Sequence, residues 1–218
     1  MTSIERIEQA AQALKVFPLA NVVLFPGTAL PLHIFEPRYQ AMVNDALASD
    51  RVIALAQPEA DADPLDASPR LRPMACAGLI AWHEALPDGR SNIIVQGIAR
   101  ARLLNELSSD HPYRELRAQI LVDPEPPADD AEELLRQALL ELSSHLPGEV
   151  AQNLLQTASR SGGGMLADVI ASTVVPDLER RQQLLAETDV RARLRAVMTE
   201  VGDVLARLSS AAPRGPLN

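Results

Sequence analysis

Residues 17–39 read Phe-Pro-Leu-Ala-Asn-Val-Val-Leu-Phe-Pro-Gly-Thr-Ala-Leu-Pro-Leu-His-Ile-Phe-Glu-Pro-Arg-Tyr, the densest apolar stretch of the chain and the richest in proline. Each proline removes a backbone donor and fixes φ, so no helix runs through the stretch. The β-branched and aromatic residues at 22–25 predict a short strand. Pro26-Gly27 then predicts a turn. A helix is predicted to begin at Glu36 or Pro37, because proline suits a first helical turn.

The residues from here to Val122 alternate between apolar runs and turn signals. Pro87-Asp88-Gly89 is typical of a hairpin turn, and Gly97 interrupts an apolar pattern as a bulge or a close backbone approach would. Several short strands with one helix favour a small, closed or strongly curved sheet. The further strands are predicted at 51–57, 74–86, 91–96, 98–104 and 113–122.

The chain is predicted to have five parts. Residues 1–15 form a leader helix or a partly ordered extension, with Lys15 ahead of the first strand, and residues 16–122 form the β-rich subdomain. The proline- and acid-rich segment 123–130 is a linker. Apolar residues recur at helical spacing over 131–208, which predicts a helical bundle. The small and polar residues 209–218 predict a disordered tail.

The composition argues against several classes of function. The formal net charge is −9, so the chain offers no broad basic surface for nucleic acid or an anionic membrane. The sequence contains no run of about 18 apolar residues, so we expect no transmembrane helix. The charged N-terminus does not resemble a signal peptide. The single cysteine, Cys76, fits a reducing compartment. We therefore expect a cytoplasmic protein.

The residue types needed for common catalytic chemistry are missing or badly spaced. Lys15 is the only lysine, so no Walker A loop can form, and a Ser–Lys dyad would have to use this one residue. The histidines show no metal-ligand spacing with one another or with Cys76. We expect no catalytic residue, no metal and no cofactor. The four histidines are His33, His83, His111 and His145.

A glycine run, Ser161-Gly-Gly-Gly164, precedes an apolar helical pattern. Backbone N–H groups at such a helix start could hold an anion. Because no lysine or second binding motif accompanies the run, we favour a flexible hinge over an anion site.

The stretch 17–39 closely resembles the opening signature of the Lon protease N-terminal domain, F-P-L-x-x-x-V-L-F-P-G-x-x-L-P-L-H-I-F-E-P-R-Y. The resemblance covers about residues 16–208 and implies an α+β fold, with an N-terminal PUA-like small β-barrel subdomain followed by a C-terminal helical bundle. Full Lon proteases continue into ATPase and Ser–Lys protease modules, so the resemblance implies a stand-alone member without them. The glycine run departs from the family pattern. Further similarity lies in residues 76–80, 88–89, 96–100, 166–172 and 184–194.

The resemblance implies a non-catalytic module that binds unfolded or tagged polypeptides, as an adaptor or regulator of proteolysis. A full-length Lon-type protease would be a further partner. The alternative is a PUA-like domain that binds a small ligand or RNA. The expected contact surface consists of Phe35, Glu36, Arg38, Tyr39, Trp82 and Arg100. For Glu36 and Arg38 the other interpretation is a charge pair at a helix start, and for Trp82 it is a core position.

Overall fold

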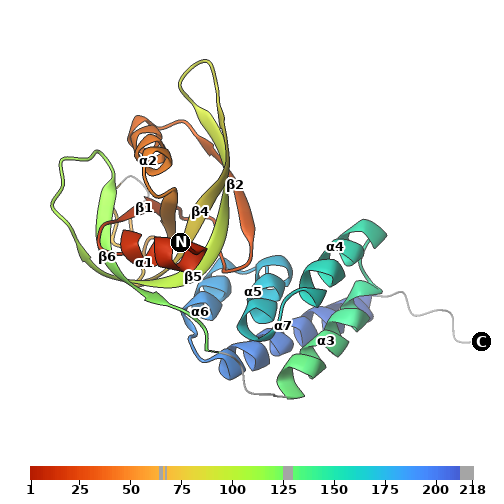
Figure 1. The fold of residues 1–218 in the computed structure, drawn as a ribbon. Helices are drawn as coiled ribbons and strands as arrows, with labels where there is room; N and C mark the ends of the chain where they lie inside the picture. Colours follow the sequence, from red (N-terminus) through yellow and green to blue (C-terminus); the bar gives the residue numbers. More distant parts are fainter. Residues whose placement is uncertain (64–65, 67, 125–129, 212–218) are drawn as a thin grey trace, which may run out of the picture. The chain divides into compact units, whose positions relative to one another are not determined.

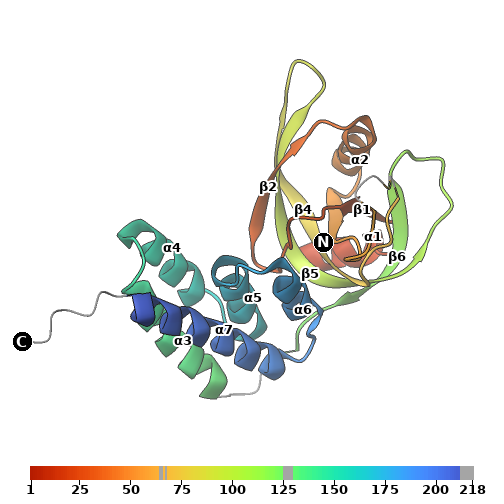
Figure 2. The same ribbon diagram turned by 180° about the vertical axis from the view of Figure 1, so that it is seen from behind.

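The computed structural model describes residues 1–63, 66, 68–124 and 130–211, seen from two sides in Figures 1 and 2. The chain divides into two compact units, Met1–Val122 and Asp123–Asn218. The first unit carries all the named strands and the second is helical, which confirms the α+β class. Residues 125–129 of the predicted linker and 212–218 of the predicted tail lie outside the described residues.

The first unit is built on a six-stranded sheet with the order β2-β5-β4-β3-β1-β6. An additional pairing between β5 and β6 closes five of the strands into a small barrel and leaves β2 outside, at an edge. The predicted PUA-like small barrel is therefore confirmed. The strands are β1 (Leu14–Pro18), β2 (Ala29–Ile34), β3 (Val52–Ala56), β4 (Met74–Ala85), β5 (Ser91–Glu106) and β6 (Arg114–Leu121).

Strand β5 pairs with β4 along one edge and with two successive strands, β2 and β6, along the other. Its residues 91–96 pair with β2, whereas residues 100–106 pair with β6, and Gly97 lies between the two parts. A Cβ atom at Gly97 would overlap the carbonyl oxygen of Phe25, so the predicted close backbone approach is confirmed. The two strands predicted on either side of Gly97 are one continuous strand.

Residues 22–25 do not form the strand that the sequence predicts. Their apolar character instead reflects burial, because Val23, Leu24 and Phe25 are at most 7% exposed. A turn holds the segment: the Thr28 hydroxyl donates to the Phe25 carbonyl oxygen (2.8 Å), and Gly27 has a φ of 81°. The turn prediction is confirmed. So is the helix, since α2 runs over Pro37–Ala48 with Pro37 as its first residue.

The N-terminal helix α1 (Ser3–Ala10) packs into the barrel core. A capping box between Thr2 and Glu5 starts the helix, and Ile7 is fully buried. The prediction that Lys15 lies ahead of the first strand is wrong, because β1 begins at the buried Leu14. The core cluster around α1 consists of Ile7, Ala10, Leu14, Val16, Val52, Ala54, Ala56, Ala75, Ala77, Ala101, Leu103, Leu116 and Ala118.

The second unit contains five helices within the described residues. Helix α7 continues to Ala211, three residues beyond the predicted end of the bundle, because the helical backbone extends into the polar residues. No helix of the described part of the chain is long and apolar enough to cross a membrane. The helices are α3 (Asp130–Ser143), α4 (Gly148–Ser159), α5 (Gly163–Val174), α6 (Leu178–Ala186) and α7 (Val190–Ala211).

A buried ion-pair cluster joins α5 and α7. The side chains of Arg193 and Asp168 are both 0% exposed, and Arg193 Nε lies 3.2 Å from Asp168 Oδ1. Arg193 also pairs with Asp123 and donates from Nη1 to the Glu187 carbonyl oxygen at 2.7 Å. A charged group removed from water requires such partners. The cluster therefore ties the start of the second unit to its last helix.

Gly163 and Gly164 form the buried start of α5, which argues against the predicted flexible hinge. The N–H of Gly163 donates to Glu132 Oε2 (2.9 Å), and Arg136 binds Glu132 while donating to the Ser161 carbonyl oxygen (2.6 Å). Burial alone would raise the pKa of Glu132, but the hydrogen bonds from Arg136 and Gly163 hold it below its ordinary value. The anion at this helix start is a carboxylate of the same chain.

Candidate functional site

The residues expected at the contact surface all belong to the first unit, but they lie in different surroundings. Phe35 and Trp82 lie on an exposed face formed by β2, β5 and β4, whereas Arg38 and Tyr39 line a pocket near the start of α2. Arg100 belongs to neither. The face and the pocket are described in turn.

The exposed face is assembled from rows of residues paired across three strands. Trp82 pairs with Ile94 and Ile94 with Pro31, and the next row joins Glu84, Asn92 and His33. At alternate positions of β2 and β5, which point to the opposite side, Ile34, Ile93 and Val95 are buried in the core. We call the exposed side the hairpin face. It consists of Pro31, His33, Phe35, Trp82, Glu84, Asn92 and Ile94.

Large aromatic side chains flank a polar row on the hairpin face. Phe35 is 60% exposed and Trp82 is 46% exposed. Between them, the Asn92 amide donates to Glu84 Oε2 (3.1 Å), and its oxygen lies 2.8 Å from His33 Nδ1. The His33 ring stacks near Phe35, with centroids 6.2 Å apart. The face thus offers apolar contact area beside oriented polar groups, which suits another polypeptide.

The start of α2 is held together by local contacts. Arg38 forms an ion pair with Glu36 (2.9 Å), and its guanidinium lies 4.6 Å from the centre of the Tyr39 ring. Tyr39 is only 6% exposed, and its ring centre is 4.2 Å from that of Phe17. The structure therefore favours the interpretation of a charge pair at a helix start, with Tyr39 as a core residue.

The expectation that Arg100 contributes to a surface is wrong. Arg100 is 1% exposed, while Arg102 on the same strand is exposed. The alternation of apolar and basic residues predicts one solvent-facing side of the strand. At this point of β5, however, Ala99, Arg100 and Ala101 are all buried, so the strand is covered on both faces.

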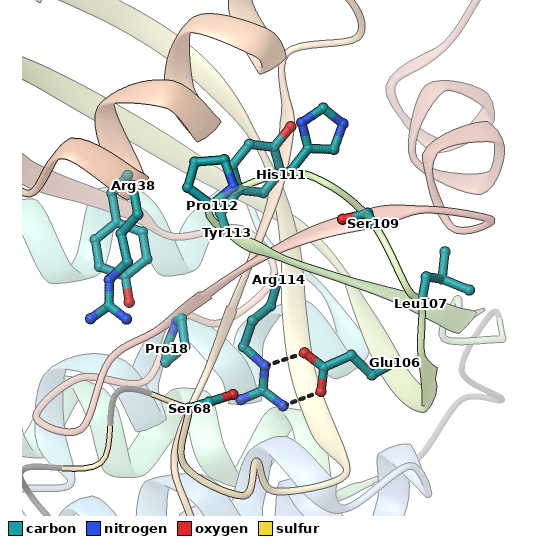
Figure 3. A pocket seen from close by; sticks show the side chains of 11 residues that line it. Pro18, Arg38, Ser68, Glu106, Leu107, Ser109, His111, Pro112, Tyr113 and Arg114 are labelled. Carbon is teal, nitrogen blue, oxygen red and sulfur yellow. Dashed lines mark hydrogen bonds and ion pairs between the residues drawn. The ribbon is translucent and has the colours of Figure 1, made fainter.

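A pocket of about 350 Å³ lies beside the start of α2. Its charged side chains are paired with neighbours: Arg114 binds both oxygens of Glu106 at 2.7 Å, as Figure 3 shows, and donates to the Pro69 carbonyl oxygen at 2.6 Å. These pairings leave the pocket without a strong preference for a charged ligand. The lining residues are Pro18, Arg38, Tyr39, Ser68, Glu106, Leu107, Ser109, His111, Pro112, Tyr113 and Arg114.

One wall of the pocket contains a tyrosine that is hydrogen-bonded to a carboxylate. Tyr113 donates a hydrogen bond to Asp45 Oδ2 (2.8 Å), and the His111 ring stacks on Tyr113 with centroids 4.9 Å apart. Burial first, and then this bond to a carboxylate, raise the pKa of Tyr113 far above its ordinary value. No sequence pattern predicted the pocket, because its lining comes from separate segments with the patterns of loops and strand ends. No group of three or more metal-ligating side chains occurs among the described residues.

A family model described as "ATP-dependent protease La (LON) substrate-binding domain" matches residues 13–202. Among curated proteins, the Lon protease of Roseiflexus castenholzii is 34% identical over 197 residues, which are 86% of this chain and 24% of that protein. Lon protease 2 of Herpetosiphon aurantiacus is 33% identical over 206 residues, or 88% of this chain and 24% of that protein. The chain thus spans about a quarter of the length of these relatives.

Two solved structures share the fold. The N-terminal domain of the Mycobacterium avium complex Lon protease superimposes with a TM-score of 0.68 at 20% identity, over 88% of this chain and 98% of that one. A Lon N-terminal domain protein from Xanthomonas campestris gives a TM-score of 0.64 at 21% identity, over 86% and 97% of the two chains. At these identities the likeness concerns the fold.

Proposed function

The chain belongs to the family of ATP-dependent protease La (LON) substrate-binding domains, and from this premise we propose that it binds unfolded or tagged polypeptides without chemically altering them. The observation that carries the proposal is the hairpin face, where Trp82 and Phe35 remain 46% and 60% exposed. A folded polypeptide hides its apolar side chains, whereas an unfolded one presents them. Exposed aromatic groups on a rigid sheet therefore select for unfolded chains.

The position of these aromatics supports a binding role over a purely structural one. Exposed tryptophan and phenylalanine side chains gain no stabilising free energy from burial in the free protein. Contiguous apolar surface marks interaction sites. The strands beneath them are held by the buried side chains of Ile34, Ile80 and Ile93, which fixes the geometry of the face before any ligand arrives. Binding therefore requires little reorganisation of the protein.

We further propose that the module acts as an adaptor or regulator of proteolysis. A non-catalytic chain that captures unfolded polypeptide either delivers it to a Lon-type protease or withholds it from one. Degradation of an unfolded substrate by a Lon-type protease, measured with increasing amounts of this protein, separates the two: delivery raises the rate and competition lowers it. An unchanged rate would remove the regulatory role and leave binding intact.

Fluorescence polarisation of a labelled, permanently unfolded polypeptide tests the binding itself, with the folded form of the same polypeptide as control. We expect roughly micromolar affinity for the unfolded form alone. Trp82→Ser and Phe35→Ser should each weaken binding by about tenfold. Leu104→Ser is the matched control, because Leu104 is an exposed apolar residue (56%) of the same unit outside the hairpin face.

The outcomes separate the functions that the sequence left open. Equal affinity for folded and unfolded forms, or no binding to either, would contradict the proposal. In that case the pocket beside Tyr113 becomes the place to test for a small ligand, and salt-dependent RNA binding becomes the test of the other alternative.

A further inference from the structure

We propose that the edge strand β2 takes up an extended segment of the bound polypeptide as an added strand. The segment would carry two apolar side chains four positions apart, with a hydrogen-bond-donating side chain midway between them. This inference rests on the proposed function and names its substrate class. It concerns the backbone of the ligand, which the exposed aromatics alone do not address.

The edge of β2 is open in the part of the chain that the structure describes. Strand β2 is the terminal strand of the sheet and pairs there with β5 alone. The side chains of Ala29, Pro31 and His33 are exposed, so this face of the strand is also accessible to a ligand. Figure 1 shows β2 along the outer side of the β4–β5 hairpin. An open edge presents backbone N–H and C=O groups that an extended peptide can pair with.

The register shows which backbone groups face outward. The N–H of Gly97 donates to the carbonyl oxygen of Thr28 at 2.8 Å. In an antiparallel ladder, hydrogen-bonded and non-hydrogen-bonded pairs alternate. If the alternation continues from this pair, the backbone N–H and C=O groups of Leu30, Leu32 and Ile34 point toward β5. The backbone groups of Ala29, Pro31 and His33 then lie at the open edge.

Pro31 agrees with this assignment and limits the edge. Proline has no N–H, so a position facing β5 would lose a bond of the ladder, whereas an outward position loses none. The open edge therefore presents the N–H groups of Ala29 and His33 and the carbonyl groups of Ala29, Pro31 and His33. A guest strand finds donors on either side of Pro31 and lacks one at the centre. This gap keeps pairing weak and reversible.

The side chains of the hairpin face specify the guest. Pro31, His33 and Phe35 follow one another at alternate positions, so the same side of a guest strand meets an apolar, a polar and an apolar neighbour. The polar neighbour is oriented: the Glu84 carboxylate accepts from the Asn92 amide, whose oxygen faces His33 Nδ1. This arrangement makes Nδ1 the donor, and in that tautomer Nε2 of His33 is an acceptor. An arginine of the guest can donate a hydrogen bond to this nitrogen.

Alternate backbone methylation tests the pairing directly. The probe is a fluorescein-labelled disordered peptide of threonines with leucines four positions apart and an arginine midway, and two variants carry N-methyl groups on odd or on even residues. Strand addition predicts that one set weakens binding by at least about tenfold while the other changes it by less than about threefold, because only alternate N–H groups face β2. An equal effect of both sets would overturn the proposal.

Substitution at the edge provides an independent test. Pro31→Ala restores the missing donor and should tighten binding about threefold to tenfold, the range of one net hydrogen bond. Ala29→Pro removes a donor at the first position of β2, where proline is tolerated, and should weaken binding. Circular dichroism and unfolding curves verify that both variants fold. Unchanged or weaker binding by Pro31→Ala would contradict strand addition, because the restored N–H would then form no hydrogen bond with the ligand.

The same measurements distinguish failure of this inference from failure of the proposed function. If Trp82→Ser abolishes binding of unfolded polypeptide while methylation parity and Pro31→Ala have no effect, the ligand binds through side chains and strand addition is wrong. If the wild-type protein binds unfolded polypeptide but not the leucine–arginine peptide, the stated ligand class is wrong. If neither ligand binds, the proposed function fails as well.

Discussion

The backbone of Phe25 lies directly over Gly97, so closely that a Cβ atom on Gly97 would stand 3.0 Å from the Phe25 carbonyl carbon and 3.2 Å from Cys76 Sγ. The N–H of Gly27 donates to the Gly97 carbonyl oxygen at 3.0 Å. This contact attaches the irregular, proline-rich segment to the barrel at the point where β5 changes partners. It explains how a segment without strand structure remains buried.

Gly97→Ala should destabilise the protein by about 2–3 kcal/mol, because the added methyl group meets backbone rather than a flexible side chain. Denaturant unfolding measures the change in the free energy of unfolding. Gly202→Ala is the control, since nothing lies within 4 Å of a Cβ atom there and the position is inside α7. The control should stabilise by up to about 1 kcal/mol. A Gly97→Ala protein as stable as wild type would contradict the close approach.

Arg193→Met should destabilise the second unit by about 3–5 kcal/mol, because it removes the cation that faces the buried carboxylate of Asp168. The double variant Arg193→Met/Asp168→Leu should recover part of this loss. Thermal and denaturant unfolding of the single and double variants form a double-mutant cycle. Additive losses would show that the two side chains are not coupled.

Glu132→Gln should weaken the start of α5 at neutral pH by about 1–2 kcal/mol. The pKa of Glu132 is lower in the folded protein than its ordinary value of 4.5, so the ionised group stabilises the fold above that pH, and the contribution disappears as the pH falls. The difference in unfolding free energy between wild type and variant should therefore shrink in acid. Glu133→Gln, at an exposed position, is the control. A pH-independent difference would contradict the role of the charge.

Both tyrosines should resist ionisation at about pH 10.5, where an exposed tyrosine is mostly ionised. Burial raises the pKa of Tyr39, and burial with the Asp45 hydrogen bond raises that of Tyr113 further. Because these values lie above those of the unfolded chain, the stabilising contribution is lost as the pH rises beyond the ordinary value. Absorbance titration of tyrosinate measures this, and Asp45→Asn should lower the pKa of Tyr113. Ordinary titration of both would contradict the geometry.

The sequence predicts the fold well where local chemistry and tertiary packing agree. The turn at Gly27, the helix start at Pro37 and the close approach at Gly97 all depend on residues with restricted or exceptional backbone freedom. Residues 23–25 are apolar because they are buried, and burial does not require a strand. Strand propensity reports a fit to a half-buried surface, so it misassigns such a segment.

The candidate site was less predictable, because exposure depends on what covers each face. Phe35 is exposed as expected, and Trp82, for which a core position was the other interpretation, is exposed as well. Tyr39, however, packs on Phe17, and Arg100 lies where the barrel strand is covered on both sides. Alternation along one strand indicates which residues share a face and leaves open whether another segment lies on it. The open edge of β2 depends on the strand order, which pattern alone does not reveal.

Trp82 is the only tryptophan of the chain, so its fluorescence tests the central claim most directly. An unfolded polypeptide without tryptophan is added, and emission is followed together with polarisation of a label on the ligand. Binding at the hairpin face predicts that emission shifts to shorter wavelength and saturates at the same midpoint as the polarisation. Saturable polarisation with unchanged Trp82 emission would place the binding site elsewhere and contradict the account.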